Sequence, residues 1–171
     1  RRKRMFGTVD LPHGVSLRPS RSGDRAFERM VHDASRWDLW LADADPDEIR
    51  DIVAMQHTAQ SEGYGHQFPD ALYFIIEKTG TACGRLVLDF SGNTVHVVDI
   101  ALIPEAQGKG IGPCVLQAVQ NIAGQIGAPV VLMTQTMNTP ALRLYKKLGF
   151  QLLDRPNPAY VRLSWTMPKA I

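Results

Sequence analysis

Residues 95–112 read VHVVDIALIPEAQGKGIG, and this stretch decides the fold. Its first eight residues are almost wholly apolar, which predicts a strand buried near the centre of a sheet. A proline turn follows, and Gly108, Gly110 and Gly112 then alternate with other residues. Apolar residues at spacings of three and four come next and predict a helix over about 110–124. The stretch therefore predicts a strand, a glycine turn and a helix in succession.

The segments on either side of this stretch predict a mixed sheet. Upstream, runs rich in β-forming residues at 72–77 and 83–90 are separated by turn residues, so with 95–102 they predict an antiparallel meander. A strand at 15–17, a helix at about 24–35 and a second helix beginning at Ala44-Asp45-Pro46 precede the meander. Downstream we expect a strand at 130–134, a helix at 138–148, strands at 150–153 and 160–166, and a turn at 154–158 between those two strands.

These elements predict an α/β chain of the α+β type. We expect a mixed, mostly antiparallel sheet of about six to seven strands flanked by about four helices. The chain has 171 residues, the size of one ordinary domain. We interpret residues 1–10 as a basic tail or a remnant of an expression tag, with Met5 as a candidate native start, and residues 11–171 as a single domain.

The composition narrows the classes of partner. The formal net charge is only +2, so the basic run at residues 1–4 is interpreted as a solvated tail, and no nucleic acid is expected. No apolar stretch approaches the roughly 20 residues that span a membrane, so we expect a cytoplasmic protein without a membrane partner. Cys83 and Cys114 lack metal-ligand spacing and are interpreted as reduced packing residues.

The glycine turn has the chemistry of a phosphate site. Glycines let the backbone take left-handed angles, and the helix that follows adds unpaired N–H groups and a partial positive charge. Lys109 adds a mobile charge. A nucleoside-triphosphate loop would need a hydroxyl where Gly110 stands, and a dinucleotide turn would need glycine where Pro113 stands. Taken alone, the turn leaves open either a phosphate ligand or a plain connection.

A second motif lies at residues 138–150, which read NTPALRLYKKLGF. Asn138 is a good N-cap, and Gly149 suits the left-handed position just past a helix end. As a lone segment, it indicates a capped helix and no function.

Together the two motifs resemble the GNAT superfamily of N-acetyltransferases. The turn is similar to its motif A, Gln-x-x-Gly-x-Gly, and residues 138–150 match its Asn-x-x-Ala-x-x-Leu-Tyr-x-Lys-x-Gly-Phe pattern. The resemblance implies that the turn cradles the coenzyme A pyrophosphate and that a bulge splays the preceding strand. It also implies that Asn138 meets the pantetheine and that Tyr145 protonates the leaving thiolate. The implied cofactor contacts are Leu102, Ile103, Gln107, Gly108, Lys109, Gly110, Ile111, Gly112, Asn138 and Tyr145.

The activity implied by this resemblance is acetyl transfer from acetyl-CoA to a primary amine, by direct attack in a ternary complex and without a metal. The acceptor is an unidentified small molecule or peptide, and a homodimer is compatible with the pattern. An acyl-CoA-binding sensor or scaffold without turnover is the alternative. Tyr145 is the expected acid, and members of the family are thought to carry a base near the position of His96, which makes His96 the favoured base.

Strand alternation places His96 and Asp99 on opposite faces unless a bulge intervenes. Asp99 is interpreted first as hydrogen-bonded within the sheet, although a raised pKa would also suit it to be the base. The acceptor region of the family corresponds to residues 37–68, with acids that could attract a cationic amine. The candidate residues there are Trp37, Trp40, Asp43, Asp45, Asp47, Glu48, His57, Tyr64 and His66, and the two histidines lack metal-ligand spacing.

Overall fold

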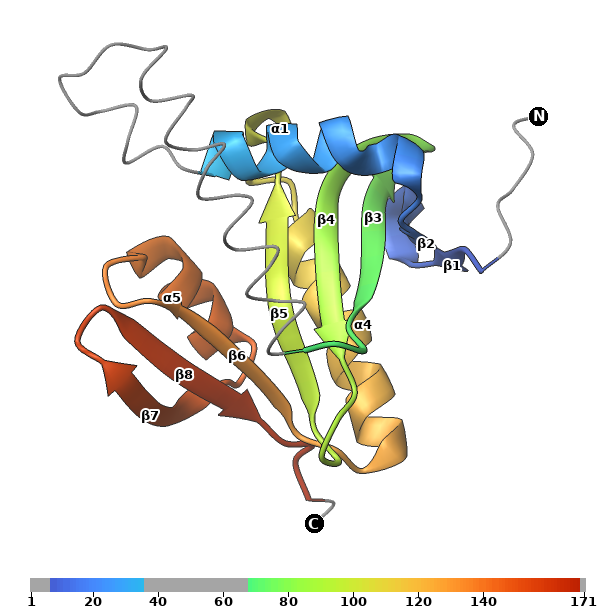
Figure 1. The fold of residues 1–171 in the computed structure, drawn as a ribbon. Coiled ribbons are helices and arrows are strands. Elements are labelled where there is room, and N and C mark those ends of the chain that lie inside the picture. The colour runs from blue at the N-terminus through green and yellow to red at the C-terminus, as the bar shows by residue number, and fades with distance from the viewer. Residues whose placement is uncertain (1–6, 36–67, 170–171) are drawn as a thin grey trace, which may run out of the picture.

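In the part of the chain that the structure describes, eight strands form one sheet in the order β1-β2-β3-β4-β5-β6-β8-β7 (Figure 1). The computed structural model describes residues 7–35 and 68–169. Its strands are β1 Val9–Asp10, β2 Val15–Pro19, β3 Leu72–Lys78, β4 Thr81–Asp89, β5 Val95–Leu102, β6 Val130–Gln135, β7 Gln151–Asn157 and β8 Tyr160–Trp165. Its helices are α1 Arg25–Ser35, α4 Ile111–Ile126 and α5 Thr139–Lys147, with 3₁₀ turns at Pro12–Gly14, Ser22–Asp24 and Pro104–Ala106.

The sheet is mixed and mostly antiparallel, as the sequence predicts. Neighbouring strands from β1 to β5 are antiparallel, and so are the pairs β6–β8 and β7–β8. The pair β5–β6 is parallel, and α4 forms the crossover between its two strands. The predicted meander is β3, β4 and β5, and its last strand has the predicted bounds of 95–102. The count of six to seven strands is too low, because the two-residue β1 falls in the segment assigned to the tail.

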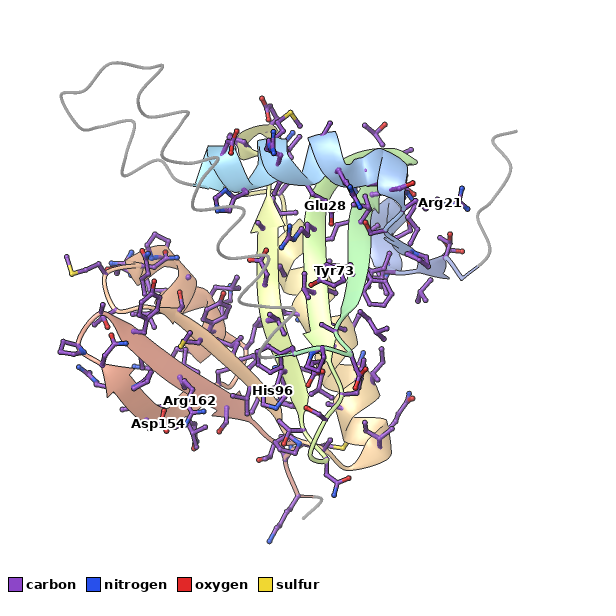
Figure 2. The ribbon with its side chains drawn as sticks, in the orientation of Figure 1. Arg21, Glu28, Tyr73, His96, Asp154 and Arg162 are labelled. Carbon is purple, nitrogen blue, oxygen red and sulfur yellow. The ribbon has the colours of Figure 1, made fainter. Side chains whose placement is uncertain are left out.

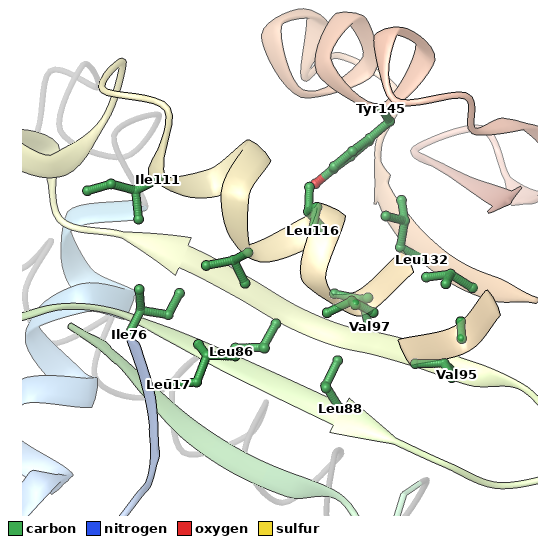
Figure 3. Close-up of a cluster of buried hydrophobic side chains, with 14 of the residues drawn as sticks. Leu17, Ile76, Leu86, Leu88, Val95, Val97, Ile111, Leu116, Leu132 and Tyr145 are labelled. Atoms are coloured by element: carbon green, nitrogen blue, oxygen red, sulfur yellow. The ribbon is translucent and has the colours of Figure 1, made fainter. Parts of the chain in front are cut away.

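Helices cover both faces of the sheet (Figure 1). On one face α1 contacts β4 and β5, and on the other α4 contacts β2, β5 and β6. We call these the α1 face and the α4 face. The main apolar cluster lies on the α4 face, where Leu86, Val97 and Leu116 are among the buried side chains (Figure 3). Val31 of α1 closes a smaller buried set on the α1 face.

The α4 helix shows how sequence period becomes packing. Its buried apolar residues recur at spacings of three and four and begin at Ile111 next to the glycine turn. Ile122 has the same spacing but is 41% exposed, so it does not belong to the buried face of α4. The helix ends at Gly127, whose φ of 72° suits the residue past a helix end. The buried apolar set is Ile111, Val115, Leu116, Val119 and Ala123.

Two other boundaries bear on the expectations. The turn expected at 154–158 is wrong, because β7 continues to Asn157 and Asp154 forms an ion pair with Arg162 of β8. The helix expected from Ala44-Asp45-Pro46 onward lies outside the described residues. In the part of the chain that the structure describes, no helix is both long and apolar enough to cross a membrane.

Candidate active site

The centre of the sheet opens between β5 and β6. The two strands are paired only from Val95 opposite Val130 to Val97 opposite Leu132. Beyond that point β5 runs on to Leu102 and β6 to Gln135, and Figure 1 shows the two strands diverging. Beyond Val97, the edge of β5 that faces β6 therefore has no strand partner among the described residues, and an extended ligand can bind its backbone groups as a neighbouring strand would. We call the region between the diverging strands the gap.

A bulge at Val98 stands where the strands part. Val97 faces Leu88 of β4 and Asp99 faces Val87, so Val98 is an extra residue without a partner in that pairing. After the bulge, Ile100 packs on the same apolar cluster as Val97. Strict alternation therefore fails at Val98, as the sequence analysis allowed. The side chains of His96 and Asp99 consequently point to the same side of the sheet, the α1 face.

The glycine turn follows the free end of β5. Gly108 and Gly110 have φ of 72° and 79°, and a Cβ atom on either would meet nothing within 4 Å. The space over the turn is therefore open, and glycine is required there for its backbone angles rather than for a close contact. Gly110 caps α4 without a side-chain bond, and the first helical bond runs from the Cys114 N–H to its carbonyl at 3.1 Å. The N–H groups of Ile111 and Gly112 thus lack helical partners, and they suit a phosphate.

Hydrogen bonds fix the turn to the end of β5. Gln107 donates from Nε2 to the Leu102 carbonyl at 3.1 Å. The Ile103 N–H donates to Cys83 of β4 at 2.9 Å, and the Ile103 carbonyl accepts from Ala106 at 3.0 Å. Because neighbouring N–H groups of a strand point to opposite sides, the Leu102 N–H is directed toward the gap. Of the two residues expected to contact the thioester arm, Leu102 is therefore the better placed.

A cavity of about 490 Å³ borders the turn on its β2 side. Lys78, Lys109 and Gly110 line it, so positive charge gathers beside the unpaired N–H groups of the turn. The described residues thus meet the requirement for binding a pyrophosphate, which is convergent N–H donors with a nearby cation.

The second motif forms α5, which packs beside α4. Asn138 accepts a hydrogen bond from the Ala141 N–H at 3.4 Å and caps the helix, as expected. Tyr145 is 9% exposed and packs against Phe150 with ring centroids 5.8 Å apart. Gln120 of α4 donates from Nε2 to the Leu148 carbonyl at 2.9 Å, which ties the end of α5 to α4. A direct hydrogen bond therefore joins the helices that carry the two motifs.

The electrostatics couple Tyr145 to Asp99. Burial raises the pKa of Tyr145 to about 12, and the charge of Asp99 adds to that rise. Burial also raises the pKa of Asp99, although Arg85 opposes the rise through an ion pair of 3.2 Å. Tyr145 thus stays protonated at neutral pH, as a proton donor must be. Asp99 holds a proton more tightly than an ordinary aspartate, which suits a general base.

His96 lies in a different part of β5. It faces Asp89 of β4 and Val131 of β6, where β5 is paired on both edges. Its ring lies 5.4 Å from that of Phe68 between centroids. Figure 2 shows His96 well below Tyr73, on the same side of the sheet. Of the two base candidates, Asp99 therefore lies in the part of β5 that diverges from β6. His96 lies in the part that is still paired with β6.

Two charged residues near Asp99 were not predicted from the sequence. Arg85 on β4 is 5% exposed and lies 5.9 Å from the centroid of the Tyr73 ring. Glu28 lies on the sheet-facing side of α1 (Figure 2). Arg85 could have been noticed because it is a charged residue inside the apolar run 83–90. The spacing of three between Glu28 and the buried Val31 was a signal for Glu28.

The remaining sequence-based candidates fall elsewhere. Within residues 7–35 and 68–169, no three metal-ligating side chains gather, and the absence of a metal stays a prediction. The acceptor candidates Trp37, Trp40, Asp43, Asp45, Asp47, Glu48, His57, Tyr64 and His66 lie outside the described residues, as do residues 1–4.

Comparison with known proteins gives a consistent family. The model of the acetyltransferase (GNAT) family matches residues 33–150. The chain is 29% identical over 125 residues to an N-alpha-acetyltransferase of Sulfurisphaera tokodaii, covering 61% of this chain and 75% of that protein. It is 30% identical over 161 residues to a mycothiol acetyltransferase of Pseudarthrobacter chlorophenolicus, covering 84% of this chain and 45% of that protein.

Solved structures share the fold at lower identity. A PaiA N-acetyltransferase of Thermoplasma acidophilum in complex with coenzyme A matches with a TM-score of 0.69 and 17% identity, over 90% of this chain and 99% of that one. An acetyltransferase of Thermus thermophilus matches with a TM-score of 0.66 and 16% identity, over 92% of this chain and all of that one. These matches support the described arrangement of sheet and helices.

Proposed function

Because this chain belongs to the acetyltransferase (GNAT) family and is an acetyl-CoA-dependent N-acetyltransferase, we propose that it acetylates a primary amine by direct attack within a ternary complex. The observation that carries the proposal is the parting of β5 and β6 at Val98. It places a backbone edge, a glycine turn and the Tyr145 helix around one gap.

The donor contacts that we propose follow the gap from the turn inward. The N–H groups of the turn bind the pyrophosphate, with Lys109 as a nearby cation. Gln107 holds the turn against the end of β5, and the Leu102 N–H binds the thioester arm. Acetyl-CoA supplies an acyl carbon with a good leaving group. The proposed donor-binding residues are Leu102, Ile103, Gln107, Gly108, Lys109, Gly110, Ile111, Gly112, Asn138 and Tyr145.

We assign the acid to Tyr145. Its pKa of about 12 keeps the hydroxyl protonated, and a thiolate leaving group needs one proton as the carbon–sulfur bond breaks. The Tyr145 ring lies in the main apolar cluster, which keeps water away from it. The proton therefore stays on the phenolic oxygen until the thiolate leaves.

We assign the base to Asp99 in preference to His96. Because of the bulge, Asp99 lies on the α1 face, beside the gap. The raised pKa of Asp99 favours taking a proton from an ammonium. The neutral nitrogen then attacks the acyl carbon, and the carbon–sulfur bond breaks as Tyr145 gives its proton to the thiolate. The second proton lost by the nitrogen restores Tyr145 through solvent, and the proton on Asp99 leaves to solvent, so each turnover yields the amide, the coenzyme A thiol and one proton. His96 stays as the other candidate, because the two assignments differ in a measurable way.

Direct attack agrees with the state of the cysteines. Cys83 is buried, and burial raises the pKa of both the Cys83 and the Cys114 thiols. A thiol with a raised pKa is a poor nucleophile at neutral pH. Neither cysteine therefore suits an acyl-enzyme route.

The experiment is an amine-panel screen that follows the release of free coenzyme A, run beside calorimetry with acetyl-CoA. Binding together with release on at least one amine is the expected result. Binding without release on any amine, unchanged in Tyr145→Phe, would favour the sensor or scaffold alternative. No binding at millimolar acetyl-CoA would contradict both functions.

A further inference from the structure

Charged side chains from three separate elements gather on the α1 face beside the gap. Arg85 of β4 faces Ala101 of β5, two residues after Asp99 on the same face. The α1 helix contacts both of these strands and carries Glu28. Figure 2 shows Glu28 between α1 and the sheet, with Tyr73 farther down the same face. Glu28 and Arg85 therefore lie on the same face as the proposed base, Asp99. We call these three residues the polar wall.

The charges of the polar wall do not balance. The Arg85 side chain is 6% exposed, and its Nε lies 3.2 Å from Asp99 Oδ2. The Tyr73 ring covers the guanidinium at 5.9 Å. This pair neutralises itself, so Glu28 brings an extra negative charge to the wall. Burial is the main cause of the raised pKa of Asp99, and the negative charge of Glu28 adds to it.

One carboxylate oxygen of Glu28 lacks a hydrogen-bond donor. Glu28 Oε1 is buried and has no hydrogen bond in the described structure, and the Arg85 Nε is likewise buried without a directed hydrogen bond. Buried polar atoms are almost always satisfied, so an unsatisfied one calls for a missing group. A carboxylate oxygen accepts only, and the missing group must be a donor, most favourably a cation.

We infer that Glu28 binds the ammonium group of the acceptor, and that the acceptor is a cationic amine with no carboxylate next to the reacting nitrogen. An ammonium has three N–H donors, so it can donate to Glu28 and to Asp99 at once. Asp99 takes one proton to release the neutral amine, while Glu28 keeps the nitrogen in place. A carboxylate beside the amine would meet the unbalanced negative charge of this wall and be repelled.

This inference rests on the proposed function and is tested with amino acids and their amides as acceptors. Each pair presents an amino group on the same carbon and differs by one negative charge. Because the amide also lowers the pKa of that amino group, kcat/KM is compared for the neutral form of the amine. We expect the amides to be preferred at least about tenfold in kcat/KM, the scale of one charge-assisted hydrogen bond. In Glu28→Gln we expect KM for the amides to rise about ten- to hundredfold, with kcat and acetyl-CoA affinity little changed.

Two further variants keep the test independent of folding. Asp70→Asn removes an exposed carboxylate outside the wall and controls for net charge, so its kinetics should match the wild type. Glu28→Asp keeps the charge but shortens its reach, so it should keep the preference for amides while raising KM. Equal use of acids and amides by the wild type, or an unchanged KM in Glu28→Gln, would overturn the inference. Failure to bind acetyl-CoA or to acetylate any amine would instead be a failure of the proposed function.

Discussion

The two halves of β5 differ in what lies along their edges. From Val95 to Val97 the strand is paired with β4 on one side and β6 on the other, whereas from Val98 onward the described strands pair it with β4 only. The first half is held on both edges, and the second half has an unpaired backbone edge that we propose binds the acyl donor. One extra residue at Val98 frees the edge and also turns Asp99 toward the α1 face. A single bulge therefore accounts for both the unpaired edge of β5 and the orientation of Asp99, the proposed base.

The largest effect is expected from blocking the turn at the free end of β5. Gly110→Asp puts a side chain at a φ of 79° and a negative charge where the pyrophosphate is proposed to bind. We expect acetyl-CoA affinity to fall about a thousandfold, because charge repulsion adds to the lost N–H donors. Calorimetry measures it.

Gly127→Asp is the matched control for backbone strain. Gly127 has a φ of 72° and open space around it, but it lies at the other end of α4. Both variants should lose similar stability in urea unfolding, and only Gly110→Asp should lose affinity. Equal affinity in the two variants would remove the turn from the donor site.

Removing the Tyr145 hydroxyl tests the side of the gap that α5 supplies. Tyr145→Phe should lower kcat about a hundredfold and leave acetyl-CoA affinity within about twofold, because only the proton donor is lost. Steady-state release of coenzyme A measures the rate, with Tyr160→Phe as the control for loss of a tyrosine hydroxyl elsewhere. An unchanged kcat would exclude Tyr145 as the acid.

The pH profile tests whether the free half of β5 carries the base. Asp99 must be deprotonated to accept a proton, so kcat/KM should rise with pH through a pKa above that of an ordinary aspartate. Asp99→Asn should lose this limb and about tenfold or more in rate. Since Glu28 raises the pKa of Asp99, Glu28→Gln should move the limb to lower pH. A limb that persists in Asp99→Asn belongs to another group.

The smallest effect is expected in the paired half of the strand. His96→Gln should change kcat less than about threefold, because His96 packs on Phe68 where β5 and β6 are still joined. The measurement is the same assay of coenzyme A release. A loss near a hundredfold, with the acidic limb abolished, would transfer the role of base from Asp99 to His96.

The turn and the helix cap that we propose for the donor site could be predicted from sequence because their geometry is local. Gly108 and Gly110 determine their own backbone angles, and Asn138 caps the helix that it precedes. The same locality explains why the bounds of β5 were predicted correctly. Periodicity and turn residues are properties of neighbouring positions, and they needed no tertiary information.

The acceptor half could not be predicted in the same way. Glu28, Arg85 and Asp99 are far apart in sequence and meet only after α1 has packed on β4 and β5. The bulge at Val98 has no residue signature, since Val97 and Val98 are both valine, so alternation alone misplaced Asp99. The raised pKa of Asp99 also depends on burial, which is a property of the folded chain.

Hydrogen–deuterium exchange with and without acetyl-CoA tests the difference between the two halves of β5 most directly. We expect acetyl-CoA to slow exchange at the amides of Leu102, Gly110, Ile111 and Gly112 and to leave those of Val95 to Val97 unchanged. Equal protection of both halves, or protection confined to the paired half, would contradict the claim that the free end of β5 and its glycine turn hold the acyl donor.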